Sequence, residues 1–132
     1  MFKGLDHVAI LVEDTEAALK VYRDRLGLPL LFSEVVNDGA VRLTHLDMGN
    51  VQLQLVEPLE PTHPLARHLR DKGPGLHHIC FSVDDVESAM AAGPERGIEI
   101  AQERPHQGTQ GKRAAFLAKG STGGVQIEIT GE

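Results

Sequence analysis

Two stretches of the chain, residues 5–14 and residues 76–85, share one pattern of polar and apolar residues. In each stretch a histidine, His7 or His78, opens a run of β-branched and small residues that ends in acidic residues. Side chains two positions apart lie on the same face of a β-strand. Both stretches are therefore predicted to be strands with one buried face.

The first copy is followed by a helix and three more strands. Asp14 or Thr15 can cap the helix, an acidic first turn suits its positive end, and Gly27 ends it. The turn signal Asn37-Asp38-Gly39 separates two of the following strands. Strands are predicted at residues 28–36, 41–48 and 51–56. The order in this half is therefore βαβββ.

The second copy repeats this order after a proline-rich connector and a short amphipathic helix around residues 65–69. The next helix is capped near Asp84 or Asp85, and Gly93-Pro94 should stop or kink it. Strands are predicted at residues 98–102, 113–117 and 125–130, with a polar loop at 104–112. The sequence thus predicts an internal duplication.

The last strand of each half carries a polar side chain of the kind that binds metals. Gln54 points away from its apolar neighbours in the first half, and Glu128 does so in the second, because strands have a period of two. If a pseudo-twofold axis relates the halves, these two residues can converge with His7 and His78. Two imidazoles, an amide oxygen and a carboxylate are ligands that a borderline divalent metal accepts.

Composition narrows the class of protein. A chain of 132 residues with 41% hydrophobic and 24% charged residues suits one globular domain. We expect a single domain with module 1 at about 1–58, a connector at 59–74 and module 2 at about 75–132. The net charge of −6 argues against an extended nucleic-acid interface.

Two further features of the sequence bear on the cellular location. The one cysteine, Cys80, cannot form an internal disulfide. The sequence has no signal-peptide pattern and no apolar run of membrane length. We therefore expect a cytoplasmic protein without a membrane partner.

These motifs resemble a known family. The two βαβββ modules, Gly75-Leu76-His77-His78-Ile79 and the final Gly123-Gly124-Val125-Gln126-Ile127-Glu128 are similar to the vicinal oxygen chelate (glyoxalase/bleomycin resistance/dioxygenase) superfamily. Within it the chain looks most like the methylmalonyl-CoA epimerases. The resemblance covers essentially the whole chain. It implies an α+β fold in which two tandem βαβββ modules form a curled mixed sheet around a metal-binding cavity.

The resemblance also implies a site and a reaction. In the family pattern His7, Gln54, His78 and Glu128 are the ligands of one divalent metal ion, which could be Co, Ni, Zn, Mn or Mg. The implied enzyme inverts C2 of an acyl thioester by proton abstraction through a metal-stabilised enolate, with Glu128 as one catalytic base. Its expected partners are an acyl-CoA or glutathione thioester substrate and a second copy of the chain in a homodimer.

Two positions depart from the family pattern. Bacterial epimerases often carry a glutamate where this chain has Leu43, so the second base would have to be a water or another group. His45 lies on the same strand and could act as that base, although a structural role is the simpler interpretation. The segment Ala118-Lys119-Gly120 stands where family members usually have His-Pro-Lys.

Three other functions remain open. Lactoylglutathione lyase uses a nearly identical ligand set, generally with glutamate at the position of Gln54. An extradiol dioxygenase would need two histidines and one carboxylate around iron, whereas an amide ligand favours a redox-inactive Lewis acid. A non-enzymatic binding protein of the bleomycin-resistance type would lack the metal ligands.

The remaining chemically active residues receive simpler interpretations. Cys80 is expected to pack and not to act as a nucleophile. His77 should face away from the site, because it alternates with His78. His63 and His68 are expected on the surface of the connector and His106 in a loop near the mouth of the cavity. Candidate contacts to a coenzyme A phosphate are Arg104, Lys112, Arg113 and Lys119.

Overall fold

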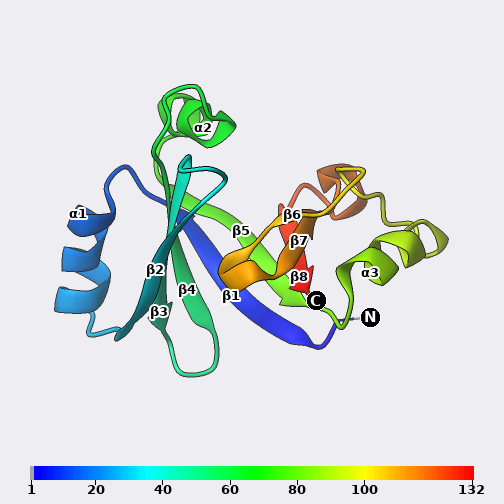
Figure 1. Ribbon diagram of the computed structural model, residues 1–132, viewed down its shortest axis with the longest axis horizontal. Coiled ribbons are helices and arrows are strands. Elements are labelled where there is room, and N and C mark those ends of the chain that lie inside the picture. Colours follow the sequence, from blue (N-terminus) through cyan, green and yellow to red (C-terminus); the bar gives the residue numbers. More distant parts are fainter. Residues whose placement is uncertain (1) are drawn as a thin grey trace. The chain divides into compact units, whose positions relative to one another are not determined.

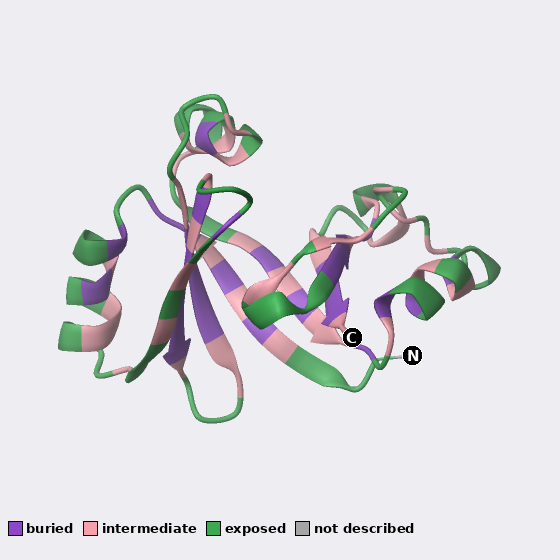
Figure 2. Cartoon of the chain, in the orientation of Figure 1, coloured by how far each residue is buried: buried purple, intermediate pink, exposed green. Residues whose placement is uncertain are grey.

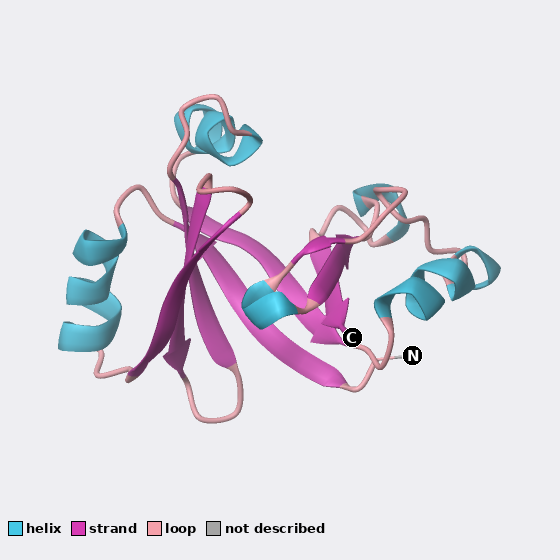
Figure 3. Ribbon diagram, viewed as in Figure 1, coloured by secondary structure: helices cyan, strands magenta, loops and turns pink. Residues whose placement is uncertain are grey.

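The computed structural model describes residues 2–132, and these residues form an α+β fold (Figures 1 and 3). The strands are β1 (Gly4–Leu11), β2 (Leu30–Val36), β3 (Val41–Asp47), β4 (Gln52–Pro58), β5 (Gly75–Ser82), β6 (His106–Gln107), β7 (Arg113–Phe116) and β8 (Ile127–Gly131). The helices are α1 (Thr15–Leu19), α2 (Pro64–Lys72) and α3 (Val86–Ala92), with helical turns at Lys20–Arg25, Pro94–Arg96, Thr109–Gly111 and Lys119–Ser121. Hydrogen bonds join the strands in the order β2-β3-β4-β1-β5-β8-β7-β6.

The chain divides into two compact units. The first unit is Val8–His77, and the second unit combines residues 2–7 with His78–Glu132. The division passes through β1 and β5 and not through the connector. It is therefore different from the division into two βαβββ modules, which stays a prediction.

The helix signals in the sequence are confirmed. Asp14 accepts a hydrogen bond from the Glu16 N–H at the start of α1, and Asp85 accepts one from the Ser88 N–H at the start of α3. Helix α3 ends before Gly93-Pro94, where a short 3₁₀ turn follows. Within residues 2–132 no helix has the length and apolar character needed to cross a membrane.

In the first unit, β2, β3 and β4 form antiparallel hairpins. Asn37, Asp38 and Gly39 all have positive φ in the turn between β2 and β3, which brings Val36 opposite Val41. The predicted strands of this half are confirmed to within two residues at most ends. The hairpins fix which side chains of β3 and β4 lie on the same face of the sheet.

Buried residues gather on the strands of this unit (Figure 2), and they form two separate apolar clusters. One face packs against Leu65 and Leu69 of α2, and the other packs against Tyr22 and the remainder of the first helical segment. The α2 face contains Ala9, Leu11, Val36, Val41, Leu43 and Val56. The cluster under α1 combines Leu19 of the helix with Val12, Leu46, Leu53 and Leu55. Alternation along β4 therefore follows the predicted period of two.

In the second unit, β8 lies between β5 and β7. Glu128 of β8 pairs with Cys80 of the parallel strand β5 and with Phe116 of the antiparallel strand β7. The face that α3 covers is apolar, and there Val83, Ala115, Leu117 and Ile129 cluster with Val86 and Ala89 of the helix. Glu128 alternates with Ile129, so it lies on the opposite face.

The strand predicted at residues 98–102 is wrong. The segment makes only a single antiparallel bridge, from Ile100 to Leu117. The side-chain oxygen of Gln102 accepts the Phe116 N–H and takes the place of a backbone partner. The paired strand β6 instead forms at His106–Gln107, inside the segment predicted to be a loop.

Candidate metal centre

Three of the four predicted ligands come together within the second unit. The Nε2 atoms of His7 and His78 lie 3.4 Å and 3.1 Å from the same oxygen, Glu128 Oε1. All three side chains are buried, with exposed fractions of 2%, 9% and 7%. The two imidazole rings meet edge-on, with centroids 5.5 Å apart.

Neighbouring strands supply these residues. His7 comes from β1, His78 from β5 and Glu128 from β8. The backbone N–H of Lys3 donates to the Ser82 carbonyl oxygen, which ties the start of β1 to the end of β5. Three adjacent strands thus direct their side chains to one point, and the β-sheet ladder fixes the spacing.

Asp6 orients the His7 ring. Its Oδ2 lies 2.7 Å from His7 Nδ1, and an ionised carboxylate can only accept hydrogen bonds, so Nδ1 carries the proton. The lone pair of a neutral His7 ring is then on Nε2, the nitrogen that faces Glu128. A histidine that donates its other N–H to a carboxylate is the usual arrangement of a metal ligand.

The ionisable groups of the cluster shift one another's pKa values. Burial disfavours the charged form of His7, but hydrogen bonds with Asp6 and Glu128 outweigh it and raise the pKa of His7 above its ordinary value. Burial also opposes ionisation of Glu128, yet the surrounding imidazoles of His106, His7 and His78 hold the pKa of this carboxyl well below its ordinary value. Glu128 is therefore an ionised carboxylate despite its burial.

The donor set fits a divalent metal ion. One ligand atom from each of His7, His78 and Glu128 lies within 4.8 Å of the other two, which is compatible with atoms that share one coordination sphere. The site is buried, and Asp6 accepts a hydrogen bond from the second ring nitrogen of His7. Two nitrogens and one carboxylate oxygen suit zinc, cobalt, nickel or iron-type ions of borderline softness.

His106 also contacts this cluster, and the sequence analysis did not predict this contact. Its Nε2 lies 2.8 Å from Glu128 Oε2, and its ring stacks on Phe116 at a centroid distance of 5.2 Å. The prediction that His106 is a loop residue is wrong, because it lies in β6. The available signal was its position in a segment before β7 that could pair with that strand.

Gln54 lies in the first unit and is held by His45. The amide nitrogen of Gln54 is 3.1 Å from His45 Nε2, and His45 Nδ1 is 2.7 Å from Gln52 Oε1. His45 is 0% exposed, and its ring stacks on Phe32. Both ring nitrogens are thus engaged by neighbouring amides. This supports the structural interpretation of His45 over its use as a base.

Leu43 belongs to the apolar cluster that packs against α2 in the first unit. It is 7% exposed and packs in the cluster that contains Ala9, Leu11 and Val56. No carboxylate occupies this position on β3. A leucine here cannot serve as the second acid or base.

Other candidate residues have structural partners. Burial raises the pKa of the Cys80 thiol, which is 0% exposed, so this cysteine is poorly suited to act as a nucleophile. His77 packs edge-on against His68. Arg113 forms an ion pair with Glu87, as expected for structural surface charge and not for a free phosphate contact.

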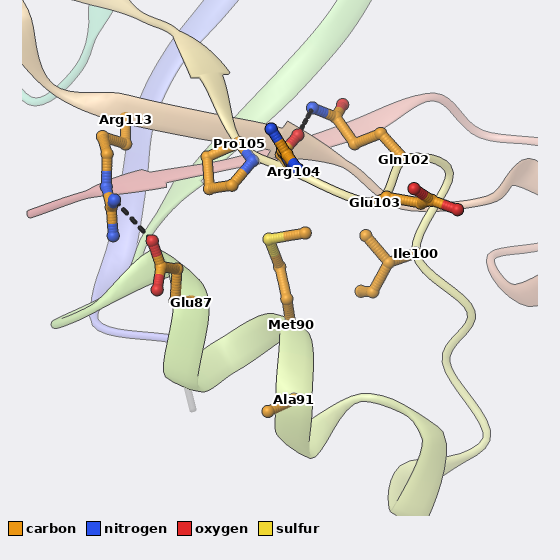
Figure 4. A pocket seen from close by; sticks show the side chains of 9 residues that line it. All are labelled: Glu87, Met90, Ala91, Ile100, Gln102, Glu103, Arg104, Pro105 and Arg113. Atoms are coloured by element: carbon orange, nitrogen blue, oxygen red, sulfur yellow. Dashed lines mark hydrogen bonds and ion pairs between the residues drawn. The ribbon is translucent and has the colours of Figure 1, made fainter.

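A surface pocket beside α3 is distinct from the metal centre (Figure 4). It is lined by Glu87, Met90, Ala91, Ile100, Gln102, Glu103, Arg104, Pro105 and Arg113. Met90 and Ile100 also pack against the apolar cluster on the α3 face of the second unit. Glu128 lies on the other face of β8, so this pocket is not the site of the proposed chemistry.

Comparison with known proteins places the chain in a family. The family described as the glyoxalase/bleomycin resistance protein/dioxygenase superfamily matches residues 6–116. The chain belongs to this superfamily. The resemblance seen in the motifs is thereby confirmed.

Individual relatives refine this placement. The chain is 34% identical to the uncharacterized protein YqjC of Bacillus subtilis (strain 168), over 95% of this chain and 89% of that protein. It is 33% identical to the ethylmalonyl-CoA/methylmalonyl-CoA epimerase of Cereibacter sphaeroides, over 98% of both chains. A solved structure of methylmalonyl-CoA epimerase in complex with methylmalonyl-CoA and NH₄⁺ superposes with a TM-score of 0.89 and 29% identity, covering 100% of this chain and 96% of that one.

Proposed function

We propose that this protein is a metal-dependent methylmalonyl-CoA epimerase. The observation that carries the proposal is the buried cluster of His7, His78 and Glu128 in a chain of this superfamily. Support for the substrate comes from the similarity to acyl-CoA epimerases along nearly the full length of the chain. A homodimer and a cytoplasmic location stay predictions from the sequence.

The residues that would hold the metal are His7, His78 and Glu128, with Gln54 as the fourth ligand of the family pattern. The Gln54 amide is 4% exposed, and its nitrogen lies 3.1 Å from His45 Nε2. A divalent ion at such a site supplies Lewis-acid stabilisation of negative charge on substrate oxygens.

Glu128 is the proposed base for the proton at C2 of the acyl thioester. Its lowered pKa keeps the carboxylate ionised at neutral pH, which is the state that can accept a proton, but it also lowers the basicity of the group. Burial keeps bulk water from this carboxylate, which strengthens its electrostatic interactions. Because Leu43 offers no second carboxylate, a water molecule is the proposed partner on the other face of C2.

The test is exchange of the C2 proton of methylmalonyl-CoA with deuterium from D₂O. Protein stripped of metal should catalyse no exchange, and protein reloaded with Co²⁺ should catalyse rapid exchange together with inversion of C2. Turnover of the hemithioacetal of methylglyoxal and glutathione is measured in parallel. Turnover of that compound without exchange of methylmalonyl-CoA would overturn the proposal in favour of a lactoylglutathione lyase.

A further inference from the structure

We propose that His106 is a positioning residue that gives the two Glu128 oxygens different roles, Oε1 toward the metal and Oε2 toward the C2 proton. In this arrangement Oε1 faces the pair of His7 and His78, while Oε2 is held by His106. The inference rests on the proposed function, because it assumes that a metal binds on the side of Oε1. It concerns a residue that none of the sequence motifs assigns to the site.

The proton of this contact can be placed from its chemistry. His106 Nε2 lies 2.8 Å from Glu128 Oε2, and an ionised carboxylate has only acceptor atoms. Nε2 must therefore carry a hydrogen and donate it to Oε2. Hydrogen bonds to a charged group are shorter and stronger than neutral ones, so this contact fixes the rotation of the carboxylate.

His106 is itself fixed from behind by Gln102. The Gln102 amide nitrogen lies 3.0 Å from His106 Nδ1, and its oxygen lies 3.2 Å from the same atom. The shorter contact suits a neutral ring that accepts at Nδ1. Gln102 also accepts the Phe116 N–H and donates to the Arg104 carbonyl oxygen, so its amide cannot rotate without breaking two backbone contacts.

Stacking completes the support. The His106 ring lies at 23° to the Phe116 ring, and the His78 ring meets Phe116 edge-on at 5.2 Å. Phe116 thus contacts both a proposed metal ligand and the residue that holds Glu128. The orientation of the carboxylate is tied to the backbone of β7 and of the segment before β6.

The consequence for the site is a carboxylate limited to one oxygen toward the metal side. A carboxylate that turned both oxygens to one ion would occupy two positions in its coordination sphere. The hydrogen bond from His106 opposes that rotation and directs Oε2 elsewhere. Oε2 keeps a second lone pair, and it becomes the oxygen from which Glu128 accepts the C2 proton.

A first experiment tests the hydrogen bond without any metal. The ring nitrogens of ¹⁵N-labelled metal-free protein are recorded by NMR for the natural protein and for Glu128→Gln. The His106 Nε2 resonance should be of the N–H type and should shift in Glu128→Gln, while the His68 resonances stay unchanged. A His106 Nε2 of the unprotonated type in the natural protein would overturn the inference.

A second experiment tests the role at the site with Co²⁺ as the probe. The Co²⁺ affinity, by chelator competition, the visible absorption of bound Co²⁺, kcat and KM are compared for His106→Ala and His106→Gln. His106→Ala should change the spectrum and lose about 10- to 100-fold in Co²⁺ affinity or kcat, with little change in KM. His106→Gln keeps an N–H donor and should recover much of the loss.

Gln107→Ala is the matched control, because Gln107 is the exposed neighbour of His106 in β6. It should behave like the natural protein. Identical spectra, affinities and kcat in His106→Ala and the natural protein would overturn the role of His106, as would equal losses in His106→Ala and His106→Gln. Failure of the natural protein to bind Co²⁺ would instead overturn the proposed function, and the inference with it.

Discussion

Gln54 of β4 in the first unit and Glu128 of β8 in the second unit are each held by a histidine. In the first unit His45 contacts the Gln54 amide nitrogen at 3.1 Å. In the second unit His106 contacts a Glu128 oxygen at 2.8 Å. The two histidines come from strands β3 and β6. A polar side chain in each unit is thus held by a histidine from another strand.

The two histidines differ in environment. His45 is 0% exposed and is bonded to neutral amides at both nitrogens. The His106 side chain is 32% exposed and is bonded to an ionised carboxylate. A fully buried imidazole between amides contributes mainly to folding, because unsatisfied buried amides are costly. A half-buried imidazole on a carboxylate is better placed to affect chemistry than stability.

The largest expected effect is loss of the proposed metal ligands on the Glu128 side. His7→Ala, His78→Ala and Glu128→Ala should each lose most bound metal, because each removes one of the three ligand atoms that come together in the second unit. Glu128→Ala should also lose about 10²- to 10⁴-fold in C2 proton exchange, because it removes the proposed base. Metal content is measured by elemental analysis of purified protein. Unchanged metal content in all three variants would show that the site is assigned wrongly.

The next effect concerns Leu43 of the first unit, a position without a carboxylate that could act as the second base. If Glu128 is one base and water the other, deuterium exchange should be faster from one enantiomer of methylmalonyl-CoA than from the other. Leu43→Glu should speed the slow direction by about 10²- to 10⁴-fold. Its cost is a carboxylate in an apolar cluster, which raises the pKa of the new group and weakens folding.

Leu43→Gln is the control for the Leu43→Glu variant, because an amide of the same shape cannot accept the proton. Equal exchange from both enantiomers in the natural protein would contradict the one-carboxylate scheme. A second base would then already be present in the natural protein.

A smaller effect separates the two histidines by stability. His45→Ala should lower the free energy of unfolding by about 3 kcal/mol, because it leaves a cavity and removes the partner of two amides. His106→Ala should cost about 1 kcal/mol or less, since water can reach its place. Urea denaturation of metal-free protein measures both. A larger loss of stability in His106→Ala than in His45→Ala would contradict the conclusion that His45 contributes mainly to folding and His106 mainly to the site.

The smallest expected effect on metal content is that of Gln54→Glu. A carboxylate oxygen replaces the amide oxygen at the same reach, so bound metal should be retained. The variant loses the N–H that faces His45 Nε2, which should cost about 1 kcal/mol of stability. Elemental analysis and urea denaturation follow the two quantities. Loss of the metal would contradict the exchange of one oxygen ligand for another at residue 54.

The sequence by itself determined the features that depend on local order. The period of two along a strand separates Gln54 from Leu53 and Glu128 from Ile129, and the structure confirms that each pair faces opposite ways. The caps at Asp14 and Asp85 depend on neighbouring backbone N–H groups, so they too were predictable. The α+β class follows from the repeated order of these elements.

Only the tertiary structure decided which distant side chains meet. Glu128 and His106 are 22 residues apart, and their contact requires β6 to pair with β7, in a segment without strand periodicity. The predicted strand at 98–102 failed because Gln102 takes the Phe116 N–H with its side chain. Hydrophobic periodicity reports which face of an element is buried, but it carries no information on which loop residue will satisfy a buried carboxylate.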